Sequence, residues 1–164
     1  MTMGMVYSMS FDGQSITAAD GNVDLFELLC PSDAVFCLLH AELGQSSDAG
    51  DAEAELIRIS ILRIHTSFVS GSGGAAGVEE PFHVGYSTAG TVTERNNETV
   101  ATGTADTMLS TCVNVQASPA WFYEPIPERR VWISPSDALV IRVMAAVADT
   151  LTISGSITWA EYGG

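Results

Sequence analysis

Apolar and polar residues alternate at every second position along much of this chain, and this period constrains the fold more than any other feature. The alternation is clearest near the C-terminus, where Leu151, Ile153, Ile157 and Trp159 are separated mainly by threonine and serine. A period of two places successive side chains on opposite faces of a β-strand, whereas an amphipathic helix needs a period of 3.6. The pattern therefore predicts an all-β protein whose strands each bury one face.

The same pattern predicts further strands along the chain. We expect them at residues 23–29, 34–43, 56–64, 107–115, 131–133 and 138–145, with weaker strands around residues 84–86 and 100–102. Residues 94–99, ERNNET, are expected to form the turn between the two weak strands. About eight to ten short antiparallel strands without a long helix are typical of sandwiches and barrels. We therefore expect one domain, residues 1–164, with the fold of a jelly-roll type β-sandwich.

The phase of the alternation predicts which side chains face the core. In residues 34–43 the predicted shared face consists of Val35, Cys37, Leu39, Ala41 and Leu43. In residues 56–64, Ile57, Ile59 and Ile61 share a face, but Leu62 and Ile64 continue in the opposite phase. A β-bulge or sharp bend near Ile61 would produce this change of face.

The first ten residues are predicted to be either an N-terminal strand or an arm that docks on a neighbouring molecule. Met3, Met5, Tyr7, Met9 and Phe11 form one apolar face. The following Asp12-Gly13 pair is a tight-turn signal. The segment has neither a basic start nor a continuous apolar stretch, so we do not expect it to be a secretory signal.

The charge of the chain excludes several classes of partner. It has six Arg, no Lys and 20 acidic residues, which give a net charge of −14 and a pI near 4.2. Nucleic acid and anionic membranes both require clustered cations, so neither is an expected partner. Cys30, Cys37 and Cys112 form no CxxC pair and lie in apolar strands. We expect three reduced core thiols in a protein made in a cytoplasm.

The sequence carries no strong catalytic or metal-binding motif. There is no G-x-S-x-G nucleophile motif, and His40, His65 and His83 are widely separated. His40 and Glu42 would share a strand face, which resembles part of a cupin-like metal site, but a solvent-facing pair is the simpler interpretation. Residues 20–24, DGNVD, resemble the start of a calcium loop without its later ligands. We therefore expect a protein that is not an enzyme and has no metal or cofactor.

The scarce cations are concentrated after a proline-rich segment. Arg129 and Arg130 follow Pro125 and Pro127, which are predicted to hold the backbone extended. Arginine forms bidentate pairs with carboxylates and tolerates partial burial. The candidate acceptors are Glu124, Glu128, Asp137 and an acidic group on a neighbouring molecule. Ion pairs within the chain and ion pairs to a neighbour both remain open at this point.

Aromatic residues flank the same segment. Trp121, Phe122 and Tyr123 precede it and Trp132 follows it. Such a cluster can form a platform on which a sugar stacks, but aromatic residues at strand ends more often belong to the core or to a subunit contact. We interpret Trp121 and Tyr123, together with the two arginines, as contact residues.

Several segments, taken in order, resemble a family of small structural proteins of tailed bacteriophages. They are the FDG of residues 11–13, ELGQSSDAGDAEAE, the SGSGG loop, NVQASPAWFYEPIPERRVWISPSD and the closing DTLTISGSITWAEYG. The resemblance implies a jelly-roll capsid decoration or cement protein, commonly a homotrimer, that binds the major capsid protein and stabilises the icosahedral head. It implies no catalytic residues, and it implies a location on the virion surface.

Three functions follow as expectations. The leading one is the virion decoration protein, with a contact surface made by Arg129, Arg130, Glu124, Glu128, Trp121, Tyr123, Met3, Met5 and Met9. The alternative is a carbohydrate- or receptor-binding β-sandwich of a phage fibre, tail or head spike. The third is a cupin-like metalloenzyme that uses His40 and Glu42.

Overall fold

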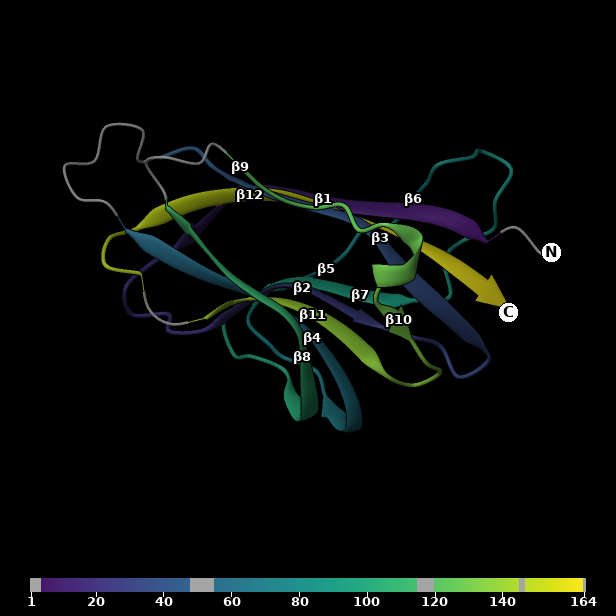
Figure 1. Cartoon of the computed structure of the whole chain (residues 1–164). Helices are drawn as coiled ribbons and strands as arrows, with labels where there is room; N and C mark the ends of the chain where they lie inside the picture. Colours follow the sequence, from purple (N-terminus) through teal and green to yellow (C-terminus); the bar gives the residue numbers. More distant parts are fainter. Residues whose placement is uncertain (1–3, 48–54, 115–119, 145–146, 164) are drawn as a thin grey trace.

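The strands build two antiparallel sheets that pack face to face, as Figure 1 shows. The structure is a computed structural model, and it describes residues 4–47, 55–114, 120–144 and 147–163. The first sheet has the order β10 (Trp132–Ile133), β3 (Ala34–Gln45), β12 (Leu151–Gly163), β1 (Met5–Ile16) and β6 (Glu80–Pro81), and β9 (Ala120–Tyr123) also pairs with β3. The second sheet has the order β5 (Ala75–Ala76), β7 (Val92–Asn97), β2 (Val23–Leu29), β11 (Ala138–Met144), β4 (Leu56–Val69) and β8 (Thr102–Asn114). The predicted all-β sandwich is thus confirmed.

Helical structure in the described residues is limited to the single 3₁₀ turn η1 (Pro127–Arg129). None of the described helical structure is long and apolar enough to cross a membrane.

The main core lies between the two sheets. The alternating residues of β12 supply Leu151, Ile153, Ile157 and Trp159, all at most 4% exposed, as their period predicts. Leu139, Ile141 and Val143 of β11 meet them from the second sheet. β12 occupies the middle of the first sheet, where it pairs with β1 on one side and β3 on the other.

The predicted change of phase in β4 is confirmed. The register of β4 against β8 shifts between Ile61 and Leu62. Ile57, Ile59 and Ile61 therefore point into the main core, whereas Leu62 and Ile64 join a second apolar cluster. This smaller cluster also includes Ala101, Ala138 and Val140.

A buried ion pair holds the loop before β8 against the second sheet. Asp24 is fully buried and its Oδ1 lies 2.5 Å from Nε of Arg142. Its Oδ2 accepts a hydrogen bond from the Ala101 backbone N–H at 2.7 Å, and Arg142 donates to the Ala101 carbonyl at 2.8 Å. One carboxylate thus links β2, β11 and the loop.

Glu27 likewise anchors the Gly/Ser loop, residues 70–74, to the second sheet. It is 3% exposed and accepts hydrogen bonds from the Ser70 hydroxyl, the Gly71 backbone and the Asn97 side chain. A Cβ on Gly71 would lie 2.4 Å from the Thr99 carbonyl, so the glycine is needed for this close approach.

Three predictions about strands were wrong. Residues 92–97, expected to lie largely in a turn, form strand β7, whereas residues 84–86 form no strand and Val84 is completely exposed. In β3 the core face consists of Phe36 and Leu38, followed by Ala41 and Leu43, because a bulge opposite Thr158 and Trp159 changes the phase.

From Met5 onward the N-terminal segment is an integral strand and not a docking arm, and residues 1–3 lie outside the described residues. β1 pairs with β12 along its length, and Tyr7 and Met9 are each 1% exposed. The Asp12-Gly13 pair does not form a hairpin turn, because β1 continues to Ile16 through a register shift between Phe11 and Gln14. Gly13 has a φ of 69° at this bulge, a conformation that suits glycine.

Candidate interaction surface

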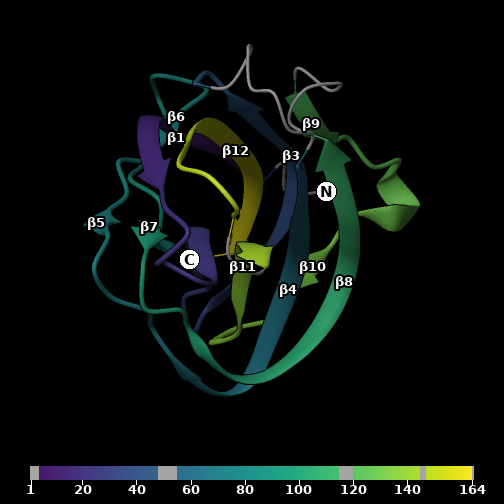
Figure 2. The same cartoon turned by 90° about the vertical axis from the view of Figure 1, so that its left-hand side faces the viewer.

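One side of the sandwich brings together the edges of both sheets. Figure 2 shows β8 beside β9, β10 and η1 on one side of the molecule, and β5, β6 and β7 on the other. Between β8 and the chain from β9 to η1 lies a groove of about 580 Å³. We call it the arginine groove, and its lining residues are Met108, Leu109, Phe122, Tyr123, Glu124, Pro125, Glu128, Arg129, Arg130 and Val131.

Local backbone chemistry fixes the wall of the arginine groove. Ile126 has an extended conformation, with φ −59° and ψ 155°, and η1 then begins at Pro127, where a helix needs no N–H donor. The Tyr123 hydroxyl donates a hydrogen bond to the Arg129 carbonyl at 3.1 Å, which ties η1 back to β9. The predicted extended segment thus ends at Ile126.

Neither arginine has a carboxylate partner within the described residues. Arg129 is exposed and forms no ion pair there. Arg130 is half-buried, and its Nε is buried without a hydrogen-bond partner. The alternative of an intrachain pair with Asp137 is therefore not found among the described residues. An unpaired, partly desolvated guanidinium is costly, so this surface favours an anionic partner.

Glu124 and Glu128 line the groove, but among the described residues neither forms an ion pair with these cations. Glu124 Oε1 lies 3.4 Å from His40 Nδ1, and Glu42 Oε2 lies 3.7 Å from His40 Nε2. His40 thus sits between two carboxylates and ties the chain after β9 to β3. His40 and Glu42 share a face as expected, but the described residues contain no group of three or more His, Cys, Asp or Glu that could hold a metal ion.

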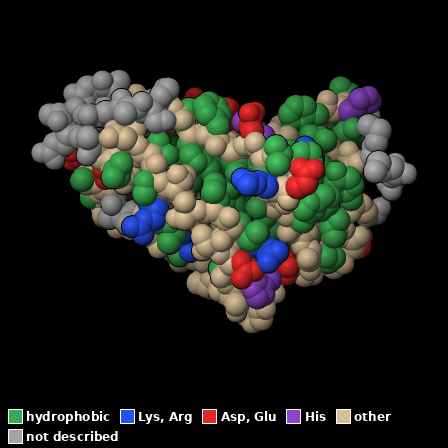
Figure 3. All heavy atoms as spheres, viewed as in Figure 1, with side chains coloured by type: hydrophobic (Ala, Val, Ile, Leu, Met, Phe, Trp, Pro, Cys, Tyr) green, Lys and Arg blue, Asp and Glu red, His purple; other side chains and the backbone are tan. Residues whose placement is uncertain are grey.

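Large apolar side chains surround the arginines. Met108 is 42% exposed, Trp132 48%, Phe122 59% and Ile126 60%. Figure 3 shows this face, where blue and red side chains lie among green apolar ones. Trp132 packs on Tyr162 with ring centroids 5.4 Å apart, so its position is fixed. Exposed apolar groups around a charged centre are typical of a protein contact surface.

The predicted contact residues separate into two groups. Tyr123, Glu124, Glu128, Arg129 and Arg130 line the arginine groove. The remaining four are Trp121, Met3, Met5 and Met9.

Trp121, Met5 and Met9 do not line the arginine groove, and Met3 lies outside the described residues. Trp121 is 8% exposed and Met9 1%, and both belong to the core, so neither side chain is available to a partner in this fold. Met5 is partly buried against the core. Met108 and Ile126 were not singled out from the sequence.

Burial raises the pKa of two of the three cysteine thiols. It raises the pKa of Cys37, an effect that the positive charge of Arg130 reduces. Burial also raises the pKa of Cys30 to about 11. Cys112 is exposed on β8, so the expectation of three buried thiols was wrong for this residue.

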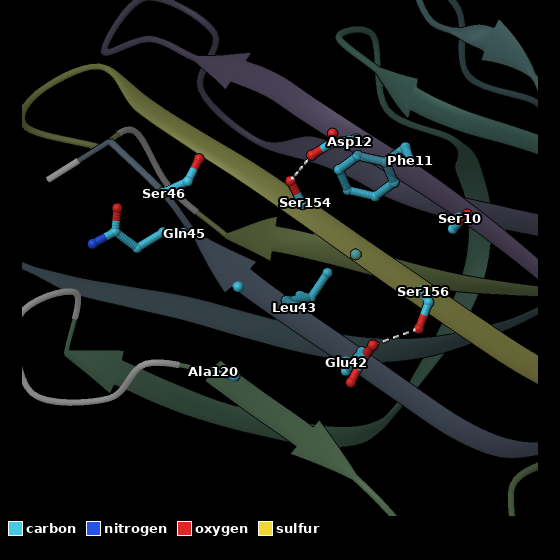
Figure 4. A pocket seen from close by; sticks show the side chains of 12 residues that line it. Ser10, Phe11, Asp12, Glu42, Leu43, Gln45, Ser46, Ala120, Ser154 and Ser156 are labelled. Carbon is cyan, nitrogen blue, oxygen red and sulfur yellow. Dashed lines mark hydrogen bonds between the residues drawn. The ribbon is translucent and has the colours of Figure 1, made fainter. Parts of the chain in front are cut away.

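A second hollow, of about 510 Å³, lies at the first sheet and is drawn in Figure 4. Ser154 donates a hydrogen bond to Asp12 Oδ1 at 2.6 Å, and Ser156 donates to Glu42 Oε1 at 3.0 Å. Each serine thus holds a carboxylate in place. The lining offers carboxylates, hydroxyls and an amide, which suit a ligand rich in hydroxyl groups.

The calcium interpretation of residues 20–24 does not fit the structure. The Asp24 carboxylate is already paired with Arg142. Asp20 Oδ2 accepts a hydrogen bond from the Thr17 backbone N–H at 2.5 Å. A second group of carboxylates that could gather round a calcium ion belongs to the acidic segment SSDAGDAEAE, residues 46–55. Its Asp48, Asp51 and Glu53 lie outside the described residues.

Comparison with known proteins returned no match to a family model, a curated protein or a solved structure.

Proposed function

We propose that this chain is a non-enzymatic structural protein of a tailed-bacteriophage virion. In this role it is a capsid decoration or cement protein that binds the major capsid protein, as a homotrimer, on the outside of the icosahedral head. The chain would be made in the host cytoplasm and act on the virion surface. The observation that carries the proposal is the arginine groove, where unpaired cations lie among exposed apolar side chains.

The strand order supports the jelly-roll part of the proposal. The chain crosses from one sheet to the other at each step from β1 to β4, and again from β10 to β11 and from β11 to β12. The first long strand, β1, pairs with the last, β12. Repeated crossings of this kind are produced by the two Greek keys of a jelly roll. A rigid module of this type suits a protein that braces a shell.

The alternative is a carbohydrate- or receptor-binding module of a fibre, tail or head spike. The hollow with fixed Asp12 and Glu42 carboxylates favours it. Trp121 is buried and cannot stack on a sugar, whereas Phe122 and Trp132 are exposed, so a stacking platform would depend on these two residues. A glycan array with the wild type and with Glu42→Gln tests it, because a real sugar site should lose binding in the variant.

Localisation on the particle tests the leading proposal. Virions of the phage that carries the gene are probed with a gold-labelled antibody against this chain and imaged by electron microscopy. Gold over the head supports a decoration protein. Gold confined to the tail or fibres supports the alternative, and absence of the chain from purified particles overturns both.

A further inference from the structure

The side of the sandwich opposite the arginine groove exposes a second set of apolar groups. Residues 78–84, VEEPFHV, include β6, the strand at the far end of the first sheet from β10. We call them the acidic edge segment. Val78 is 65% exposed, Phe82 67% and Val84 100%. Figure 2 shows β6 on the opposite side of the molecule from β8 and β9.

Backbone hydrogen bonds hold the acidic edge segment in place. The Phe82 N–H donates to the Val6 carbonyl and the Gly77 N–H donates to the Thr93 carbonyl, both at 2.9 Å. Glu80 and Pro81 pair with Ser8 and Tyr7 of β1. The apolar side chains are therefore displayed by an anchored strand. Such preorganisation lowers the entropic cost of binding.

The charges of the two sides are complementary. Glu80 is exposed and forms no ion pair in the part of the chain that the structure describes. Arg129 and Arg130 have no carboxylate partner there either. Glu124 and Glu128 also line the arginine groove, so its cations lie beside two carboxylates, of which Glu124 faces His40. The acidic edge segment presents the unpaired Glu80, so both sides combine charged groups with exposed apolar groups, and Glu80 can meet the two guanidinium groups.

We infer that the acidic edge segment of one copy docks in the arginine groove of a second copy. Glu80 then meets Arg129 and Arg130, while Phe82 and its neighbours cover Phe122 and Met108. Because the two surfaces differ and lie on opposite sides of one molecule, the contact is head-to-tail, and it forms the ring of the proposed homotrimer where the rotation between copies closes and a filament where it does not. This inference rests on the proposed role as an assembling subunit and names its partner as the chain itself.

The contact also explains where the cations are placed. Each copy carries a net charge of −14, so copies repel one another at long range. An arginine pair facing a glutamate replaces repulsion by attraction at the one place where two copies touch.

Charge exchange across the proposed contact provides the test. The mass in solution is measured by light scattering and sedimentation equilibrium for the wild type, Glu80→Arg, Arg129→Glu and the double variant. We expect a closed oligomer for the wild type. Each single variant should raise the dissociation constant about 100-fold, because like charges then face each other. The double variant should restore assembly, since the pair is re-formed with its signs exchanged.

Matched controls separate a local effect from net charge and from misfolding. Asp149→Arg makes the same change in net charge as Glu80→Arg, but at an exposed carboxylate in the turn between β11 and β12, and it should leave assembly unchanged. Circular dichroism spectra should be identical for all variants, because Glu80 and Arg129 are exposed. Thermal unfolding is compared at a dilution where the wild type is monomeric, because assembly itself raises Tm.

Two results would overturn the inference. One is a wild type that stays monomeric up to millimolar concentration. The other is an oligomer that neither single variant weakens. Either result leaves the antibody labelling of virions unaffected, so failure of this contact is distinguishable from failure of the proposed function.

Discussion

Replacement of Asp24 by asparagine tests how the second sheet holds its outer loop. The substitution keeps the shape of the side chain but removes the charge that faces Arg142, whose side chain is 12% exposed. The guanidinium then remains buried without its counter-ion, and the Ala101 N–H and Arg142 compete for one weaker acceptor. Breaking a buried pair in this way costs about 3–5 kcal/mol.

The assay is urea unfolding followed by tryptophan fluorescence, with a parallel thermal melt. Trp121 and Trp159 lie in the core and should report its loss. For a chain of this length, about 3–5 kcal/mol corresponds to a fall in Tm of about 6–20 °C. The double variant Asp24→Leu/Arg142→Met should recover part of the loss, because it removes the uncompensated charge but leaves the Ala101 N–H and carbonyl without their partners.

Asp106→Asn is the matched control, since its pair with Arg63 is also between neighbouring strands but is much more exposed. Its effect on the free energy of unfolding should be much smaller. The reasoning is refuted if Asp24→Asn is no less stable than the wild type, or if the double variant is as unstable as the single one.

Four further predictions follow from packing and burial. In the native protein a thiol reagent should label Cys112 rapidly and Cys30 only after unfolding; rapid labelling of Cys30 would contradict its burial. Burial raises the pKa of Cys30 from its ordinary value of 9.0 to about 11. The neutral thiol therefore contributes its full stabilisation below pH 9, and this stabilisation is lost as the pH rises through 11. In Cys30→Ala the free energy of unfolding should depend less on pH in this range. Gly74→Ala, whose Cβ would lie 2.1 Å from the Arg95 carbonyl, should destabilise the fold by about 1–3 kcal/mol in urea, whereas Gly13→Ala meets no atom within 4 Å and should cost less. Met9→Ala should lower the free energy of unfolding by about 2–5 kcal/mol. Deletion of residues 1–9 should abolish the cooperative thermal transition. A deletion variant that melts like the wild type would restore the docking-arm interpretation.

The sequence predicted strands well where only one face is apolar. In β12 and β11 the alternation alone identifies the core-facing residues, and in β4 the change of phase reveals the bulge at Ile61. β3 is apolar on both faces, because Cys37 is covered on the outside as completely as Phe36 is on the inside. Periodicity therefore could not reveal its bulge.

β7 escaped prediction for the opposite reason. Its sequence VTERNN is polar and resembles a turn, and Asn96 has a φ of 59°, which strands rarely contain. Its polar groups are satisfied by contacts such as that of the Asn97 side chain with Glu27. Glu27 is distant from Asn97 in sequence, so the residues of β7 alone could not reveal this partner.

The arginine groove was predicted in part. Arg129, Arg130, Tyr123, Glu124 and Glu128 come from one continuous segment, so the sequence groups them. Met108 and Leu109 reach the groove from β8, the edge of the other sheet, and only the topology brings them there.

The place of β12 in the first sheet has a consequence for synthesis on the ribosome. Residues 151–163 lie between β1 and β3, so these two strands have no partner at the centre of their sheet until the C-terminal strand has been made. Tyr7, Met9, Phe36 and Leu38, which the finished core buries, stay exposed until β12 has been synthesised. Formation of the first sheet therefore depends on pairing between strands that are far apart in sequence, which is a slow step that exposes nascent copies to aggregation.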